Sequence, residues 1–367
     1  MKLELICLGD PGKHPTIWSG TPARMLTEFR KDAGLAVSYG NISRFKLLKK
    51  LAFLLFHRWE FVIGGTHDPW MNFLYERRMK HLARRSEADW MLTVCDNFAP
   101  DGLPRDKRYA FYVDCCLFEY FKFLEGAPKW RSRYEKFYLN KEREYHGNAD
   151  AVFTQNEWTR QCLIDHDVIA PEKVFNVGFG VNLKPFTGEK DYGREELLIV
   201  LRRGTEHYKG LDLLLDAFEL LKERRPQATL SVVGTTSRTI GGVTYYEGFP
   251  RSKTVELFER AALYTMPALR EPNGITYLEG LANKAPIVGL KRFAVPEFSG
   301  YGKWGFMAER EDPRELAALL DDALSDKARL REMGLAGQKF VMERYDWSKV
   351  CRNMVDIMKR ISGRDTL

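Results

Sequence analysis

The chain has 367 residues, enough for about two domains with separate hydrophobic cores. Hydrophobic residues make up 44% and charged residues 29%, which excludes a disordered or collagen-like chain. The formal net charge of +7 suits anionic partners such as nucleotide phosphates, lipid headgroups or nucleic acid. It fits a basic solvated surface equally well.

Membrane and export signals are absent from the sequence pattern. No apolar window reaches the about 18 residues of a membrane span. The apolar run at residues 5–8 is too short for a signal peptide. The six cysteines have neither metal-finger nor redox spacing, so we expect free thiols in a cytoplasmic protein.

Apolar runs alternate with helical patterns in the first half of the chain. A helix is expected over residues 22–33, and a long polar helix around residues 134–145. Strands are expected at residues 2–8, 61–63, 90–95, 109–113, 151–154 and 174–177.

A second alternating set follows a polar segment, residues 182–192, which has the Pro and Gly signals of a linker. Residues 211–225 form an amphipathic helical pattern that ends at Pro226. Strands are expected at residues 197–201, 230–233, 262–266, 287–288 and near 305–306.

This alternation predicts an α/β protein with two doubly wound, Rossmann-like domains facing across a cleft. We expect an N-terminal domain over residues 1–182, a C-terminal domain over 183–345, and a last helix in 346–367 that crosses back to the first domain. That tail is amphipathic, so it must pack on a domain that is already built.

Two carboxylates eight positions apart, Glu271 and Glu279, flank the start of a helix expected over residues 275–283. Gly274 allows a ligand to approach the backbone closely. The N–H groups of Gly274, Ile275 and Thr276 would be available to an anion. The same pattern also fits a capped core helix with two surface acids.

A basic loop, residues 202–210, follows an expected strand and precedes a helix. Arg203 and Lys209 are candidates to hold a leaving diphosphate, because fixed cations stabilise developing phosphate charge. A solvated basic loop would show the same residues.

The loop after the first strand contains Gly20, which leaves room for a substrate, followed by Thr21 as an expected N-cap and Pro22 as first helical residue. A well-capped helix start is the alternative. No G-x-G-x-x-G pattern is present, which excludes a dinucleotide fingerprint. Asp96 and Asp114 each end an expected strand, as capping or functional acids.

Taken in order, these segments resemble a retaining glycosyltransferase of family 4, with the GT-B fold. The resemblance covers nearly the whole chain. It is carried by Glu142 and by residues 18–22, 149–152, 156–158, 177–182, 209–210, 271–279 and 345–347.

The resemblance implies roles for individual residues. Glu271 would contact the donor sugar and Glu279 the ribose diol, while Arg203 and Lys209 would hold the diphosphate. The remaining donor-binding candidates are Gly274, Ile275, Thr276, Asn273, Arg202 and Gly20. The reaction implied needs neither a protein nucleophile nor a metal or other cofactor, since the departing phosphate takes the acceptor proton.

Three positions depart from the family pattern. Asn273 replaces a phenylalanine, which bears on packing or sugar preference. The usual Gly-Arg start of the basic loop is displaced, so that Arg202 can take the place of Arg203. The family's common N-domain histidine is missing, and Asp114 stands where one branch has an aspartate.

The expected function is transfer of a hexose-type sugar from a nucleotide diphosphate sugar to a glycan, lipid-linked or protein-linked acceptor. The alternatives are a nucleotide-sugar epimerase or phosphorylase of similar fold, and an inactive glycan-binding relative. Residues 45–59 are basic and apolar, which fits either peripheral contact with the inner membrane face or a helix packed on its own sheet. No nucleic-acid-binding module is recognised.

Overall fold

The computed structural model describes residues 1–13, 17–42, 69–94, 98–122, 131–166, 168–248 and 250–363. The expected strand at 61–63, the acid Asp96 and the basic apolar segment 45–59 lie outside these residues. The chain forms two compact units, each described by itself. Unit 1 comprises Met1–Gln155, Thr159–Val177 and Trp347–Leu367, and unit 2 comprises Asn156–Trp158 and Gly178–Asp346.

Unit 1 is built on a parallel sheet of six strands in the order β2-β1-β3-β4-β5-β6. The central strands are buried on both faces, which explains their continuous apolar sequences. The strands are β1 Lys2–Cys7, β2 Ala36–Asn41, β3 Trp90–Val94, β4 Arg108–Val113, β5 Ala151–Thr154 and β6 Val174–Asn176.

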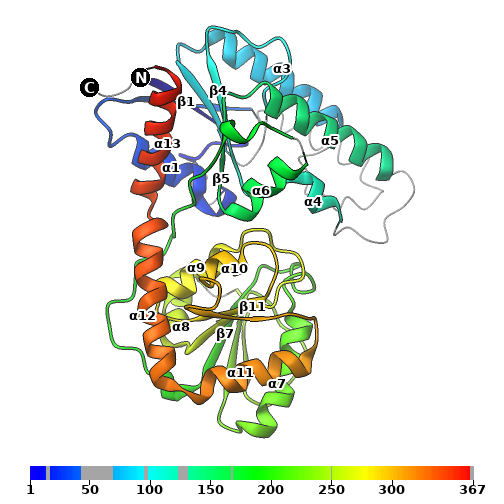
Figure 1. Cartoon of the computed structure of the whole chain (residues 1–367), viewed down its shortest axis with the longest axis vertical. Helices are drawn as coiled ribbons and strands as arrows, with labels where there is room; N and C mark the ends of the chain where they lie inside the picture. Colours follow the sequence, from blue (N-terminus) through cyan, green and yellow to red (C-terminus); the bar gives the residue numbers. More distant parts are fainter. Residues whose placement is uncertain are drawn as a thin grey trace. The chain divides into compact units, whose positions relative to one another are not determined.

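Helices cover both faces of this sheet. Helix α1 packs against α13 at one face, and α3 packs against α5 through a hydrogen bond of 2.7 Å from Asn72 Nδ2 to the Tyr145 hydroxyl (Figure 1). The helices are α1 Thr21–Phe29, α3 Pro69–Arg85, α4 Leu117–Lys122, α5 Arg131–Gly147, α6 Glu157–Asp165 and α13 Trp347–Ile361.

Unit 2 has a second parallel sheet of six strands, in the order β12-β11-β10-β7-β8-β9. Helix α7 packs against α11, and α9 packs against α12. The strands are β7 Glu196–Val200, β8 Thr229–Val233, β9 Val243–Tyr246, β10 Leu263–Thr265, β11 Ile287–Leu290 and β12 Gly305–Ala308. The helices are α7 Leu211–Arg224, α8 Arg251–Arg260, α9 Ile275–Ala282, α10 Val295–Phe298, α11 Pro313–Ser325 and α12 Lys327–Arg344.

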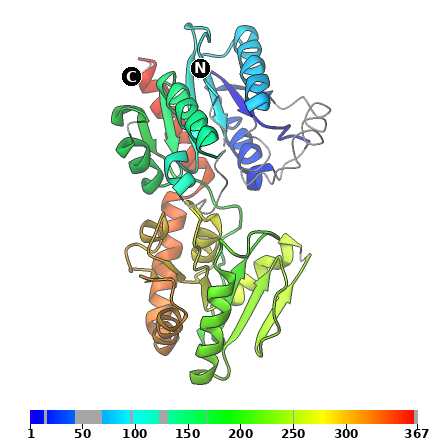
Figure 2. The same cartoon turned by 90° about the vertical axis from the view of Figure 1, so that its right-hand side faces the viewer.

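The last two helices belong to different units. Helix α12 packs in unit 2, whereas α13 packs on α1 in unit 1, as the orange and red ribbons in Figure 2 show. Val350, Met354 and Met358 recur every four residues and are buried, which places one apolar stripe of α13 against the core. The prediction of two doubly wound α/β units with a returning C-terminal helix is confirmed.

Several elements are missing from the sequence-based expectation, among them strands β2 and β9 and helix α3. Strands β2 and β9 lie at the edges of their sheets and carry few buried side chains. Helix α3 has a mostly polar sequence, with only one face buried. Among the described residues, no helix is long and apolar enough to cross a bilayer.

Candidate functional site

The strand order of unit 2 reverses between β7 and β10, which are neighbours in the sheet. In open α/β sheets, ligands bind beyond the carboxyl ends of the strands at such a reversal. Strand β7 leads into the basic loop that carries Arg203 and Lys209, and β10 leads into the loop that carries Glu271 and Gly274. The topology therefore brings two of the predicted segments to one edge of one sheet.

The two loops are held against each other by their main chains. The N–H groups of Leu269 and Arg270 donate to the Tyr208 carbonyl oxygen at 2.8 and 3.0 Å. Gly210 has a φ of 75°, and a Cβ there would lie 2.0 Å from the carbonyl oxygen of Pro267. Only glycine fits this position, because both the left-handed backbone and the close approach exclude a side chain.

This contact places Lys209 beside Glu271, and the Lys209 ammonium forms an ion pair with the Glu271 carboxylate. The two side chains are 17% and 20% exposed. Burial works to raise the pKa of Glu271, but Lys209 and the N–H groups of Asn273 and Gly274 outweigh it and hold that pKa below its ordinary value. Glu271 is therefore ionised at neutral pH.

Helix α9 begins directly after this carboxylate. Gly274 is its N-cap, with a φ of 75°, and its N–H donates to Glu271 Oε1 at 2.9 Å. The acceptor of the Gly274 N–H is thus the Glu271 carboxylate. The N–H groups of Ile275 and Thr276 lie in the first turn of α9, where no preceding helical carbonyl oxygen can accept from them. Glu279 lies further along α9 and is only 4% exposed. The alternative of two surface acids is wrong, since Glu279 is buried and Glu271 is partly buried in an ion pair.

The two arginines of the basic loop lie apart from this pair. The Arg203 side chain is 83% exposed and forms an ion pair of 3.3 Å with Glu247. Arg202 is also exposed, and its N–H donates to Thr205 Oγ1 at 3.3 Å. Within the described part of the chain, Arg203 makes no ion pair with Glu271.

One further residue contacts the Glu271 loop, and the sequence pattern assigns it no site role. Asn156, which belongs to unit 2 by its contacts, donates from Nδ2 to the Pro272 carbonyl oxygen at 3.3 Å and to Asn273 Oδ1 at 3.1 Å. The only indication of this contact in the sequence is that Asn156 belongs to segment 156–158, which carries the family resemblance. Asn273 thereby gains a polar partner that a phenylalanine could not bond.

Asp114 follows β4 in unit 1, at the carboxyl edge of that sheet. Its carbonyl oxygen accepts a hydrogen bond from Thr159 Oγ1 at 3.0 Å, and three residues later the Leu117 N–H donates to Glu142 Oε1 at 3.1 Å. The segment from Asp114 to Leu117 is therefore held at both ends. Burial raises the pKa of Glu142 to about 8, despite the Leu117 hydrogen bond and the nearby Arg143 charge.

Gly20 also lies in unit 1, before α1. Trp18, Ser19 and Gly20 have φ angles of 50°, 58° and 86°, so three successive residues are left-handed. The N-cap of α1 is Gly20, with no side-chain capping bond, and Thr21 is the first helical residue. The expectation of Thr21 as N-cap is wrong, because the left-handed turn moves the cap back by one residue.

The family described as Glycosyl transferases group 1 matches residues 186–340, which include the whole Lys209–Glu271 region. Among curated relatives, the GDP-mannose-dependent alpha-(1-6)-phosphatidylinositol monomannoside mannosyltransferase of Mycolicibacterium smegmatis is 27% identical, over 42% of this chain and 45% of that protein. A D-inositol 3-phosphate glycosyltransferase of Jonesia denitrificans is also 27% identical, over 52% of each chain. The chain spans about half the length of these relatives.

Among solved structures, sucrose-phosphate synthase from Thermosynechococcus elongatus has a TM-score of 0.71 at 14% identity, with 100% of both chains covered. At that identity the likeness concerns the fold alone. It extends over both units, and the chain has the GT-B fold.

Proposed function

We propose that the protein is a retaining glycosyltransferase, because residues 186–340 match the family described as Glycosyl transferases group 1 and the chain has the GT-B fold. It moves a hexose-type sugar from a nucleotide diphosphate sugar to an acceptor hydroxyl and forms an α-linkage. The observation that carries this proposal is the Lys209–Glu271 ion pair, buried at the strand-order reversal and next to the start of α9.

The donor diphosphate binds between Lys209 and the N–H groups of Ile275 and Thr276. A phosphate is a suitable partner for both, because a helix start carries partial positive charge and a lysine ammonium adds a full one. When the donor phosphate forms an ion pair with the Lys209 ammonium, the Glu271 carboxylate loses this partner. It can then accept hydrogen bonds from the sugar hydroxyls. Glu279 accepts from the ribose diol.

In the transfer step, the bond between the anomeric carbon and the phosphate oxygen breaks while a bond from that carbon to the acceptor oxygen forms on the same face. The acceptor proton passes to the departing phosphate oxygen. Lys209 stabilises the negative charge that develops on the phosphate. Stabilisation of developing charge by fixed groups is usually the largest single contribution to catalysis. No protein nucleophile and no metal are required in this scheme, and Asp114 acts on the acceptor side.

The experiment incubates the protein with labelled UDP-, GDP- and ADP-sugars and candidate acceptors, and then determines the product and its anomeric configuration. Glu271→Gln and Lys209→Met are compared with Glu309→Gln and Lys291→Met, which remove the same charges from an exposed ion pair of unit 2. The proposal requires an α-linked product that the first two variants lose and the control variants keep.

Other products separate the alternatives. An epimer or a sugar phosphate in place of a transferred sugar identifies an epimerase or a phosphorylase. Donor binding without turnover, for every donor tested, identifies a glycan-binding relative. A β-linked product contradicts the retaining mechanism while leaving the transferase class intact.

The acceptor is a glycan or a lipid-linked sugar. The relative from Mycolicibacterium smegmatis supports this, since its name states a GDP-mannose donor and a phosphatidylinositol monomannoside acceptor. We place the protein in the cytoplasm because, among the residues that the structure describes, the cysteines form no disulfide. These cysteines are Cys7, Cys115, Cys116, Cys162 and Cys351. Contact of residues 45–59 with a membrane remains part of this proposal, and binding to anionic vesicles at low salt tests it.

A further inference from the structure

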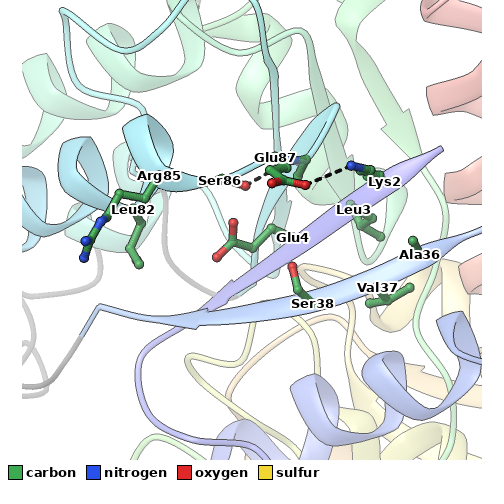
Figure 3. A pocket seen from close by; sticks show the side chains of 11 residues that line it. Lys2, Leu3, Glu4, Ala36, Val37, Ser38, Leu82, Arg85, Ser86 and Glu87 are labelled. Atoms are coloured by element: carbon green, nitrogen blue, oxygen red, sulfur yellow. Dashed lines mark hydrogen bonds and ion pairs between the residues drawn. The ribbon is translucent and has the colours of Figure 1, made fainter.

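A pocket of about 400 Å³ lies in unit 1, at the opposite edge of the sheet from Asp114. Its floor is formed by the amino-terminal halves of β1 and β2, and its side by the end of α3 and the turn that follows (Figure 3). Apolar surface comes from Leu82, Ala36 and Val37. Pockets for small ligands start at about 300 Å³ and combine apolar walls with a few placed polar groups.

The polar group inside this pocket is Glu4. It lies on β1, between β2 and β3, and is 9% exposed. Figure 3 shows its carboxylate pointing into the space between Leu82 of α3 and Ser38 of β2. Within the described part of the chain, Glu4 makes no hydrogen bond and no ion pair.

Gly40 of β2 makes room for this carboxylate. A Cβ at Gly40 would lie 2.8 Å from Glu4 Oε1 and 3.2 Å from Leu82 Cδ1. An alanine there would therefore push the carboxylate out of its position. The absence of a side chain on the neighbouring strand keeps an acid turned into the pocket.

The cations at the mouth of the pocket are engaged elsewhere. Lys2 forms an ion pair of 3.0 Å with Glu87, shown as a dashed line in Figure 3. Arg85 is exposed, and its Nη1 lies 3.5 Å from His81 Nε2 on the same helix. Among the described residues, the two cations that line the pocket thus contact groups other than Glu4, which leaves its carboxylate available to a positively charged ligand.

We propose that this pocket binds a small alkylammonium compound, whose charged group pairs with Glu4 and whose aliphatic body contacts Leu82 and Ala36. The ammonium offsets the charge of Glu4, and the apolar wall takes the methylene groups. A metal ion suits the pocket less well, since among the described residues no three acidic, His or Cys side chains gather at one point. The site is distinct from the one proposed for the donor.

Isothermal titration with 1,4-diaminobutane tests the proposal, and 1,4-butanediol is the neutral control. The diamine should bind and the diol should not. Glu4→Gln should weaken diamine binding by about tenfold or more, because it removes the buried partner of the ammonium. Glu87→Gln loses the same charge at the mouth and should change the affinity by about twofold or less.

Two further variants keep the test decisive if Glu4→Gln does not fold. Ser38→Phe fills the pocket from the exposed side of β2 and should abolish diamine binding while Glu4 stays in place. Arg85→Gln should leave the affinity unchanged or raise it. Absence of diamine binding, or equal losses of affinity in Glu4→Gln and Glu87→Gln, would overturn the proposal. A destabilised Arg85→Gln protein would show that Arg85 pairs with Glu4 and would also overturn it. Lys209→Met should bind the diamine as the wild type does, which separates this site from the donor site.

Discussion

Each unit has a glutamate in low exposure near the carboxyl edge of its sheet, and the pKa values of the two glutamates are shifted in opposite directions. In unit 2, Glu271 is paired with Lys209 and accepts from two main-chain N–H groups, so its pKa lies below the ordinary value. In unit 1, Glu142 accepts from one N–H, and burial raises its pKa to about 8. Near neutral pH the same residue type is therefore charged in unit 2 and mostly neutral in unit 1. The Lys209 ion pair outweighs burial at Glu271, whereas the nearby Arg143 charge does not outweigh burial at Glu142.

The largest effect should come from removing that cation. Lys209→Met leaves Glu271 without its ion-pair partner and removes the charge that stabilises the leaving phosphate. We expect kcat/KM for sugar transfer to fall by about 10²–10³-fold. Steady-state rates measure this, with Lys291→Met as the control that should stay within about twofold of wild type. A Lys209→Met protein with normal rates would show that the ion pair has no part in the reaction.

The next largest effect should come from separating the two loops. Gly210→Ala places a methyl group against the Pro267 carbonyl oxygen and should destabilise unit 2 by about 3 kcal/mol. Gly248→Ala is the matched control. Gly248 also has a positive φ, of 64°, but no atom of the described residues lies within 4 Å of its Cβ position. It should cost about 1 kcal/mol, the backbone contribution alone. Urea unfolding measures the free energy of unfolding of both variants. Equal losses of stability would contradict the close approach of Gly210 to the Pro267 carbonyl oxygen.

Glu142 predicts a pH dependence of stability. Between pH 4.5 and about 8 the folded chain keeps a proton that the unfolded chain releases, so the free energy of unfolding should fall as the pH rises through this window. Glu142→Gln removes this slope and should therefore be stabilising near pH 8 and about neutral near pH 4.5. Thermal unfolding of both proteins across this range measures the difference, and parallel curves would show that Glu142 is ionised in the folded state.

The smallest effect should come from Arg203. Its ion pair with Glu247 is exposed, so Arg203→Ala should change stability by at most about 0.5 kcal/mol. Because the side chain is free to turn towards a bound diphosphate, we expect donor affinity to fall by a factor of about three to ten. Titration of the donor measures this. A loss as large as that of Lys209→Met would show that the diphosphate lies on Arg203 instead.

The sequence predicts this fold well where strands are buried and poorly at the sheet edges. Continuous apolar runs identify central strands such as β4 and β8, which must be apolar on both faces. Edge strands such as β2 need few apolar residues, so Ala36–Asn41 gives no comparable signal. The sequence pattern likewise does not predict the long polar helix α3, because only one narrow face of this helix contacts the core.

The candidate site is predicted as separate segments, not as an assembly. Glu271, Gly274 and Lys209 stand out by their residue types and by their places at strand ends. Their ion pair does not, since it joins residues 62 positions apart through the contact of Gly210 with Pro267. The raised pKa of Glu142 is equally invisible in the sequence, because it depends on what surrounds the side chain after folding.

Helix α13 makes unit 1 discontinuous in the chain. Its buried face packs on α1, and the Ser362 hydroxyl accepts a hydrogen bond of 2.9 Å from the indole nitrogen of Trp90. During synthesis, residues 1–177 carry all six strands of the unit 1 sheet and leave the ribosome before α13 exists. Unit 2 ends at Asp346, so it too is fully synthesised before α13. Folding of unit 1 can therefore be completed only after the last residues are translated. A nonsense mutation just before Trp347 would remove α13, the helix that packs on α1 in this unit.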